Sequence, residues 1–186
     1  MKKAYALLFV AFSLLTITSC TKKDKCETTI CRNGGTCSDG SCTCPTGYTG
    51  SDCSTQKTPT QILISKIVVT GFPATTSNGA GWDLTDGPDI FPRFFISNTL
   101  AWSSTSHYSN CTNSYQYEFV PAQNIVITNT LAQCNVSLYD WDGVSADDPM
   151  TGLSFYPYSS TGGFPTTLNY TNIDGFNVTL FVSYVF

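Results

Sequence analysis

Six of the nine cysteines in this 186-residue chain are crowded between Cys26 and Cys53. A segment that short cannot fold on a hydrophobic core alone, and small exported modules use disulfides instead. Six cysteines allow fifteen pairings, so their number predicts a disulfide framework without fixing its connections. The alternative is a zinc site, which needs thiolates in a reducing compartment. We therefore expect this segment, called the cysteine module below, to fold in an oxidising compartment.

The amino terminus carries the pattern of an export signal. Positive charge at Lys2 and Lys3 precedes an apolar run from Ala4 to Ile17, which is too short to span a bilayer as a helix. An aliphatic residue then stands three positions before Cys20, with small residues between them. This arrangement resembles the signal of bacterial lipoproteins. The resemblance implies that residues 1–19 are a signal peptide and that Cys20 becomes the lipidated first residue.

The lipoprotein signal also implies a location and a partner. Residues 20–25 would form a lipidated tether, and an acyl group such as palmitate would hold the chain in the bacterial cell envelope, at the outer membrane. The alternative is an ordinary signal peptide cut nearby, which leaves Cys20 as an unpaired thiol. Without Lys2 and Lys3 the formal net charge of −4 becomes −6, and no basic stripe is present that would bind nucleic acid.

The cysteine spacing within residues 26–53 is specific. Paired glycines precede the third cysteine, and a Gly-Tyr-Thr-Gly turn precedes the last. The intervals read Cys26-x4-Cys31-x5-Cys37-x4-Cys42-x-Cys44-x8-Cys53. Together these features resemble EGF-like domains over the whole module. The resemblance implies disulfides that join Cys26 to Cys37, Cys31 to Cys42 and Cys44 to Cys53.

The residues that flank the cysteine module are not those of a calcium-binding EGF-like module. Such modules carry acidic or amide residues just before the first cysteine, whereas this chain has Lys22-Lys23-Asp24-Lys25. We expect no calcium there, and we interpret the module as a spacer that lifts the next domain off the membrane. Residues 54–61, rich in Ser, Thr and Pro, are predicted to be a linker. The two remaining cysteines, Cys111 and Cys134, are predicted to form a fourth disulfide.

Residues 62–186 have the pattern of an antiparallel β-sandwich. Thr, Ser, Asn, Gly, Tyr and Phe are frequent, whereas residues that favour helix surfaces are few. Short apolar or alternating runs are separated by Gly, Pro, Asn and Asp, which predicts about seven or eight strands and an all-β fold class. The first expected strand begins at Ile62. The others are Ile90–Ile96, Ser114–Phe119, Asn124–Thr128, Cys134–Tyr139, Leu153–Tyr158 and Val178–Phe186.

Acidic residues are concentrated in two stretches of this domain. All those after Gln61, except Glu118 and Asp174, lie in residues 82–89 or 140–148. Like charges repel, so such stretches either lie apart in solvent or meet at a cation that offsets the repulsion. The first stretch contains Asp-x5-Asp before an apolar strand, and the second contains Asp-x-Asp-x5-Asp. The alternative is that these residues serve only to form turns.

Both acidic patterns resemble the calcium loops of C2 domains, in which an Asp-x5-Asp loop leads into a strand and an Asp-aromatic-Asp loop follows one. The resemblance implies a C2-like sandwich that binds Ca²⁺, a hard cation with about six to eight oxygen ligands, rather than Mg²⁺ with its small octahedral shell. The chain departs from the family at Ile90, where a proline is expected, and it lacks a lysine-rich strand for acidic lipids. The implied ligands are the carboxylates of Asp83, Asp89, Asp140, Asp142 and Asp148 and the backbone carbonyl of Trp141.

Aromatic residues adjoin these acids. Trp82 and Trp141 are candidates for ligand contact, because an exposed ring beside a cation can stack on a sugar or enter a bilayer interface. The alternative for both is packing at the base of a loop. His107, the only histidine, is interpreted as a loop residue, since the chain has no Gly-x-Ser-x-Gly nucleophile pattern.

The sequence thus predicts a non-catalytic lipoprotein that acts as a calcium-dependent binding or structural module, with a glycan, lipid or protein ligand at its calcium loops. The alternative from another class is a carbohydrate-binding sandwich that uses the tryptophans. A weak glycan hydrolase that uses carboxylates such as Asp140 and Asp148 belongs to the same alternative.

Overall fold

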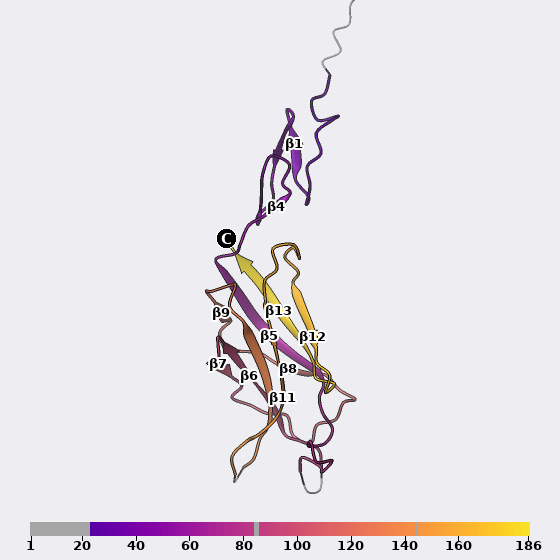
Figure 1. Ribbon diagram of the computed structural model, residues 1–186, viewed down its shortest axis with the longest axis vertical. Coiled ribbons are helices and arrows are strands. Elements are labelled where there is room, and N and C mark those ends of the chain that lie inside the picture. The colour runs from indigo at the N-terminus through magenta and orange to yellow at the C-terminus, as the bar shows by residue number, and fades with distance from the viewer. Residues whose placement is uncertain (1–22, 84–85, 144) are drawn as a thin grey trace, which may run out of the picture.

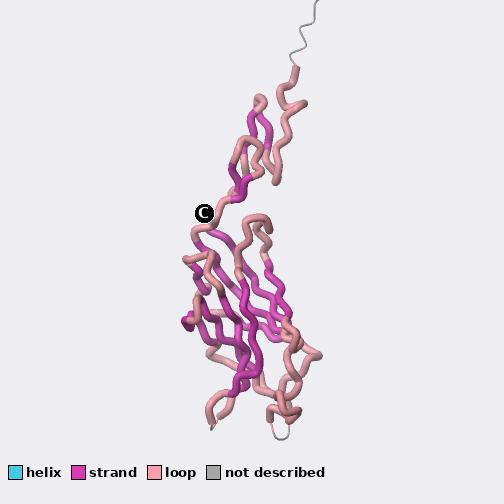
Figure 2. The backbone as a smooth tube through the Cα atoms, viewed as in Figure 1, coloured by secondary structure: helices cyan, strands magenta, loops and turns pink. Residues whose placement is uncertain are grey.

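The computed structural model describes residues 23–83, 86–143 and 145–186. The molecule is elongated, with the cysteine module at one end and a larger domain at the other (Figure 1). The described residues form strands and loops and contain no helix (Figure 2). The predicted all-β fold class is confirmed. The predicted signal peptide and Cys20 lie outside the described residues.

Three disulfides cross-link the cysteine module. Between its first and last cysteines only Gly47 and Cys53 are buried. Covalent bonds rather than an apolar core therefore hold this module together. The connections are those that the EGF-like resemblance implies. They join Cys26 to Cys37, Cys31 to Cys42 and Cys44 to Cys53.

Two short hairpins give the module its backbone. Strand β1 (Thr36–Ser38) pairs with β2 (Ser41–Thr43), and β3 (Tyr48–Thr49) pairs with β4 (Thr55–Gln56). The first hairpin turns at residues 39–40, an Asp-Gly pair whose φ angles of 51° and 83° are those of a two-residue type I′ turn. Hairpins of this length are not stable alone, so they depend on the disulfides.

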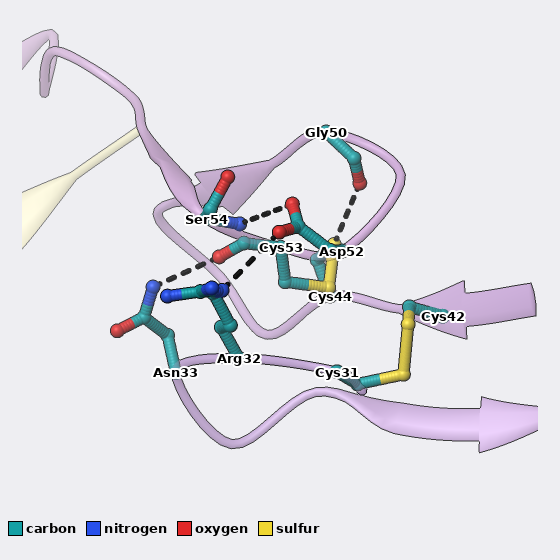
Figure 3. A network of polar contacts seen from close by, with 9 residues as sticks. All are labelled: Cys31, Arg32, Asn33, Cys42, Cys44, Gly50, Asp52, Cys53 and Ser54. Carbon is teal, nitrogen blue, oxygen red and sulfur yellow. Dashed lines mark hydrogen bonds and ion pairs between the residues drawn. A yellow bond between two sulfur atoms is a disulfide. The ribbon is translucent and has the colours of Figure 1, made fainter. Parts of the chain in front are cut away.

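A polar network closes the module at its last turn (Figure 3). The Arg32 amide donates to the Asp52 carbonyl at 2.8 Å, and the Arg32 Nε lies 3.3 Å from the Asp52 carboxylate. The Asn33 side chain donates to the Cys53 carbonyl at 2.8 Å. Hydrogen bonds from the hydroxyl and amide of Ser54 hold the pKa of Asp52 below its usual value. The loop before the third cysteine is thereby tied to the end of the module.

The rest of the chain forms two antiparallel sheets that pack face to face. The strands are β5 (Gln61–Gly71), β6 (Ile90–Ile96), β7 (Thr99–Ser103), β8 (Tyr117–Phe119), β9 (Ile125–Ile127), β10 (Cys134–Asp140), β11 (Asp148–Phe155), β12 (Thr167–Thr171) and β13 (Asn177–Val185). One sheet has the order β11-β10-β6-β7. The other has the order β12-β13-β5, and β8 and β9 pair with successive parts of β5. We call these residues the sandwich.

Alternating side chains build the core between the two sheets. Strand β10 buries every second residue from Cys134 to Asp140, and β13 does so from Val178 to Val182. Phe94 on β6 and Phe176 just before β13 are the largest fully buried side chains. The opposite face of β6 and β10 carries polar and aromatic residues, among them Arg93 and Tyr139.

The strand predictions succeed where apolar alternation is strong. Strand β6 occupies its predicted range, and β8, β9, β10 and β13 lie within one residue of theirs or inside them. Strand β11 begins at Asp148 rather than Leu153. Strands β7 and β12 were not predicted, because both lie at sheet edges and show no regular alternation of buried residues.

Cys111 and Cys134 are unbonded, which corrects the predicted fourth disulfide. Cys134 begins β10, whereas the Cys111 amide donates to the Pro88 carbonyl near the other end of that strand, where Ile90 pairs with Asp140. At about 3.3 Å per residue, β10 separates the two positions by roughly 20 Å, and a disulfide needs Cα atoms within about 7 Å. Both thiols are buried, and burial raises the pKa of Cys134 to about 11.

Aromatic contacts join the cysteine module to the sandwich. The ring of Phe164 lies 5.3 Å from that of Tyr48 and 4.8 Å from that of Phe186, measured between centroids. Gly47 fits against the same rings. Its φ is 89°, and a Cβ there would lie 2.5 Å from Phe164 and 2.8 Å from Phe186. Only glycine therefore suits this position.

Residues 54–61, predicted to be a linker, make hydrogen bonds to the sandwich. The Gln56 side chain donates to the Ser159 carbonyl at 2.7 Å and accepts from the Gly163 amide at 2.9 Å. The Thr60 amide donates to the Val185 carbonyl at 2.7 Å. We call these bonds, together with the contacts of Gly47 and Tyr48, the seam.

Candidate functional site

The two acid-rich connections both lie at the end of the sandwich opposite the cysteine module (Figure 1). The connection from β5 to β6 ends at Asp89, and the connection from β10 to β11 follows Asp140. Ile90 and Asp140 are cross-strand partners, so the register of β6 and β10 brings the two connections together. We call this end of the sandwich the tip.

Asp140 is the buried acid of the tip. Alternation along β10 turns its side chain toward the core, and the residue is 2% exposed. Its carboxylate accepts a hydrogen bond from the Asp89 amide at 2.6 Å, and the Trp141 amide donates to the Asp89 carbonyl at 2.7 Å. Burial, and secondarily the neighbouring carboxylates, raise the pKa of Asp140 to about 6. Asp140 therefore ties the two connections together while carrying an unfavourable charge at neutral pH.

Asp83 and Asp142 add to the negative charge around Asp140. The charges that raise the pKa of Asp140 are those of Asp83, Asp142 and Asp89. Burial raises the pKa of Asp83, and repulsion from Asp86, Asp89 and Asp142 adds to this increase. In the described part of the chain, Asp83, Asp140 and Asp142 form no ion pair with Lys or Arg. No cationic side chain described in the structure offsets this repulsion.

Both carboxylate oxygens of Asp89 face protein groups. Oδ1 accepts from the Asn110 amide at 2.9 Å, and Oδ2 lies 3.7 Å from Nε2 of His107. His107 in turn stacks on Trp141, with ring centroids 4.2 Å apart and an interplanar angle of 10°. Asp89 therefore holds the loop that carries His107 against the tip.

The last two acids of the second stretch are placed differently. Asp148 is the first residue of β11, pairs with Asp140 in the ladder and is exposed. It is not among the charges that raise the pKa of Asp140. Asp147 forms an ion pair with Arg93, with 2.7 Å between Nη2 and Oδ2. Four of the five carboxylates predicted to bind calcium, all except Asp148, therefore interact electrostatically at the tip.

The carboxylate and carbonyl oxygens at the tip are ligands of the kind that a hard cation prefers. Calcium takes about six to eight oxygens, which carboxylates, backbone carbonyls and water supply together. Asp83 and Asp142 are half-buried residues, and within the described residues Asp140 uses only Oδ1 in a hydrogen bond. No three His, Cys, Asp or Glu side chains among residues 23–83, 86–143 and 145–186 are close enough to share one ion. Binding would require the two connections to draw closer together.

The two tryptophans predicted to contact a ligand lie in different surroundings. Trp82 packs against the core, and its Nε1 donates to the Pro73 carbonyl at 2.8 Å. Trp141 is 42% exposed and rests on His107. Of the two, Trp141 has the more available ring.

A pocket that was not predicted from the sequence lies beside the tip. The pocket has a volume of about 230 Å³, and its lining includes Arg93, His107, Trp141 and Asp147. His107 does lie in a loop, as predicted, but nothing local in the sequence indicates that it stacks on a residue of another loop. The one available signal was Arg93 in the middle of an apolar strand, because a charged residue there must face outward or find a partner.

None of the described residues belongs to an apolar helix of membrane-spanning length.

Comparisons with known proteins give structural neighbours of the sandwich. No protein-family model and no curated protein matches the sequence. A solved C2 domain aligns with a TM-score of 0.49 and 12% identity, over 68% of this chain and 98% of its own. Human GIVD cytosolic phospholipase A2 aligns with a TM-score of 0.48 and 15% identity, over 69% of this chain but only 18% of the phospholipase. A C2 domain protein from Ramazzottius varieornatus gives 0.40 and 10%, over 68% of this chain and 91% of its own. These similarities concern the fold alone.

Proposed function

We propose that this chain is a non-catalytic, calcium-dependent binding module of the bacterial cell envelope, held at the membrane by an acyl group on Cys20. The lipoprotein-like signal supports the anchor and the location. The acidic tip supports the calcium dependence. The cysteine module, which resembles EGF-like domains in its spacing, would act as the spacer between the two.

The observation that carries the calcium proposal is the buried carboxylate of Asp140. Its pKa of about 6 leaves it ionised at neutral pH, where Asp83, Asp89 and Asp142 repel it. A bound divalent cation would turn this repulsion into attraction and would join the two connections of the tip. Asp83, Asp89, Asp140 and Asp142 would hold the ion. Asp148 and the Trp141 carbonyl, both implied by the C2 resemblance, would be further ligands.

The arrangement of the two modules supports a spacer role. The cysteine module lies at the end of the molecule opposite the tip (Figure 1). The seam fixes the module on the sandwich through Phe164 and Gln56. An anchor at Cys20 would therefore leave the tip pointing away from the membrane, where it can meet a ligand.

Calcium titration of the full-length protein in detergent tests the proposal. We expect saturable heat by calorimetry and a raised Tm, since a ligand at about 100 times its Kd adds about 2.7 kcal/mol to the free energy of unfolding. The double variant Asp140→Asn, Asp142→Asn should lose both effects. Asp39→Asn is the matched control, because it removes one acid from a distant turn whose φ of 51° asparagine accepts.

The calcium proposal is wrong if wild type shows neither heat nor a Tm shift at about 10 mM calcium, a concentration above that needed by weak extracellular calcium modules. It is also wrong if Asp39→Asn reduces binding as much as the double variant does.

The anchor is tested separately with Cys20→Ser. Labelling of cells with a palmitate analogue should mark wild type and not the variant, and the variant should move from the membrane fraction to the soluble fraction. Equal labelling of the two proteins would show that Cys20 is not the lipidated residue.

A further inference from the structure

The pocket beside the tip is a separate site, and we propose that it binds one neutral sugar ring. Its lining includes Phe91 and Arg93 of β6 and Ser103 of β7, whereas the buried acid of the tip faces the core. The inference rests on the side chains that line the pocket and does not depend on calcium.

Arg93 forms a fixed hydrogen-bonding surface in this pocket. Its Nη2 donates to Asp147 at 2.7 Å. Its guanidinium carbon lies 4.1 Å from the centroid of the Tyr139 ring and 5.1 Å from that of Phe91. A carboxylate and two aromatic rings therefore hold the guanidinium in place, so little side-chain entropy is lost when a ligand binds. Arg93 and Asp147 thus present hydrogen-bond donors and an acceptor next to each other, which is what two adjacent sugar hydroxyls require.

Two stacked aromatic rings lie beside the Arg93–Asp147 ion pair. His107 and Trp141 come from different loops and stack at 4.2 Å with an interplanar angle of 10°. Trp141 is 42% exposed although it lines the pocket. A rigid indole with an exposed surface offers a large apolar contact to the C–H face of a sugar ring at low entropic cost.

Hydroxyl groups complete the lining. Ser104, Thr105 and Ser106 connect β7 to His107 and face the pocket. The Ser104 hydroxyl donates to the Ser106 carbonyl at 2.7 Å, which shapes the loop. Within the described residues, the hydroxyls of Thr105 and Ser106 take part in no hydrogen bond. They are free to donate to a ligand or to accept from it.

The charges of the pocket favour a neutral ligand. Arg93 and Asp147 neutralise each other, so neither an anion nor a cation gains a full opposite charge. An anion would also meet repulsion from Asp89, whose carboxylate lies 3.7 Å from His107. An uncharged polyhydroxylated ring can accept hydrogen bonds from Arg93, donate to Asp147 and pack against the ring of Trp141.

The volume suits a single sugar ring inside the pocket. Pockets for drug-sized ligands occupy roughly 300–1,000 Å³, and this one measures about 230 Å³. The ring is either a free monosaccharide or the terminal residue of a glycan, and both present the same chemistry to these side chains.

Sugar titrations of the full-length protein test the proposal. Glucose, galactose, mannose and N-acetylglucosamine are each added to about 50 mM, which covers millimolar Kd values, and the indole N–H signals of the tryptophans are followed by NMR. Every titration contains EDTA, so failure of the calcium proposal cannot be mistaken for failure of this one. We expect at least one sugar to shift the Trp141 signal with saturation.

Two variants and one control locate the site. Asp147→Asn keeps the shape of the side chain but removes its charge, and it should raise the Kd at least about tenfold. Trp141→Ala should abolish saturable binding, followed by calorimetry. Tyr156→Ala, an exposed aromatic residue outside this pocket, should leave the Kd unchanged. Tighter binding of lactose than of galactose would support the site and assign it to the end of a glycan.

Two results would overturn the proposal. One is the absence of any saturable shift with all four monosaccharides. The other is binding that survives Trp141→Ala and Asp147→Asn, because the sugar would then lie elsewhere on the molecule.

Discussion

The cysteine module and the sandwich reach a stable fold by different means. From the first to the last cysteine of the module, Cys53 and Gly47 are the buried residues, and Gly47 is covered by Phe164 and Phe186 of the sandwich. The sandwich instead buries a continuous apolar core between two sheets, and its two cysteines, Cys111 and Cys134, remain thiols. Covalent cross-links thus replace burial in one region, while burial makes cross-links unnecessary in the other.

The two regions are not fully independent, because residues of the module at the seam are partly buried by contact with the sandwich. Tyr48 stacks edge-on against Phe164 of the sandwich, which also contacts Tyr184. The module therefore depends on the sandwich for apolar contact, whereas the buried core of the sandwich includes no residue of the module.

Reduction of the disulfides should give the largest difference in stability between the cysteine module and the sandwich. Loss of a native disulfide costs a small domain about 2–5 kcal/mol, and the module has three disulfides and almost no core. With dithiothreitol, we expect protease to cut residues 26–53 while the sandwich stays intact. Digestion followed by mass spectrometry measures this, with the unreduced protein as control. Joint unfolding of both regions under reduction would contradict the comparison.

Gly47→Ala should show how much the seam contributes. Gly47 and Gly79 have similar φ angles of 89° and 80°, but a Cβ at Gly79 meets nothing within 4 Å. Gly79→Ala should cost about 1–2 kcal/mol from backbone strain alone, and Gly47→Ala about 1–3 kcal/mol more from overpacking against Phe164. Urea unfolding of the sandwich, followed by tryptophan fluorescence, gives both values. Equal losses in the two variants would mean that the seam adds no stability.

Asp140→Asn should give the smallest effect, and a favourable one. The pKa of Asp140 is raised to about 6, so the folded protein binds more protons than the unfolded chain between about pH 4 and pH 6, and the free energy of unfolding falls as pH rises through that window. Asparagine keeps an acceptor for the Asp89 amide and removes the charge. At pH 7 in EDTA, we expect the variant to be more stable by roughly 1–2 kcal/mol, less than the full value of a shift this large.

Denaturant unfolding at pH 4 and at pH 7 measures whether Asp140→Asn raises or lowers the free energy of unfolding. The difference between Asp140→Asn and wild type should nearly vanish at pH 4, where Asp140 is protonated. A destabilised variant at pH 7 would show that the hydrogen bond to Asp89 outweighs the repulsion at the tip.

Local patterns predicted much of the fold. The intervals between the cysteines resemble those of EGF-like domains, and the disulfide connections that this resemblance implies are those of the structure. Strand β6 lies within its predicted bounds because Gly, Pro and Asp mark its start and apolar residues fill it. Strand β12 was not predicted because it lies at a sheet edge and shows no regular alternation of buried residues.

The calcium ligands stay a prediction. The two acidic stretches do lie near each other, since the charges of Asp83, Asp89 and Asp142 act on Asp140. The burial of Asp140 also follows from alternation, since it continues the inward series of Val136 and Leu138. The engagement of Asp89 with Asn110 and His107 could not be predicted, because that loop folds back from a different strand.

Features that depend on spacing along the chain could be predicted from the sequence: the disulfide-rich module, the alternation within strands and the two acidic stretches. Contacts between the ends of different strands could not be predicted, because they depend on how the chain folds. The tertiary structure placed Cys111 and Cys134 at opposite ends of β10, and it brought Arg93 to Asp147 and His107 to Trp141. Pairs of this kind are set by strand register and loop path, and no local pattern of residues encodes the distance between two points that lie far apart in the chain.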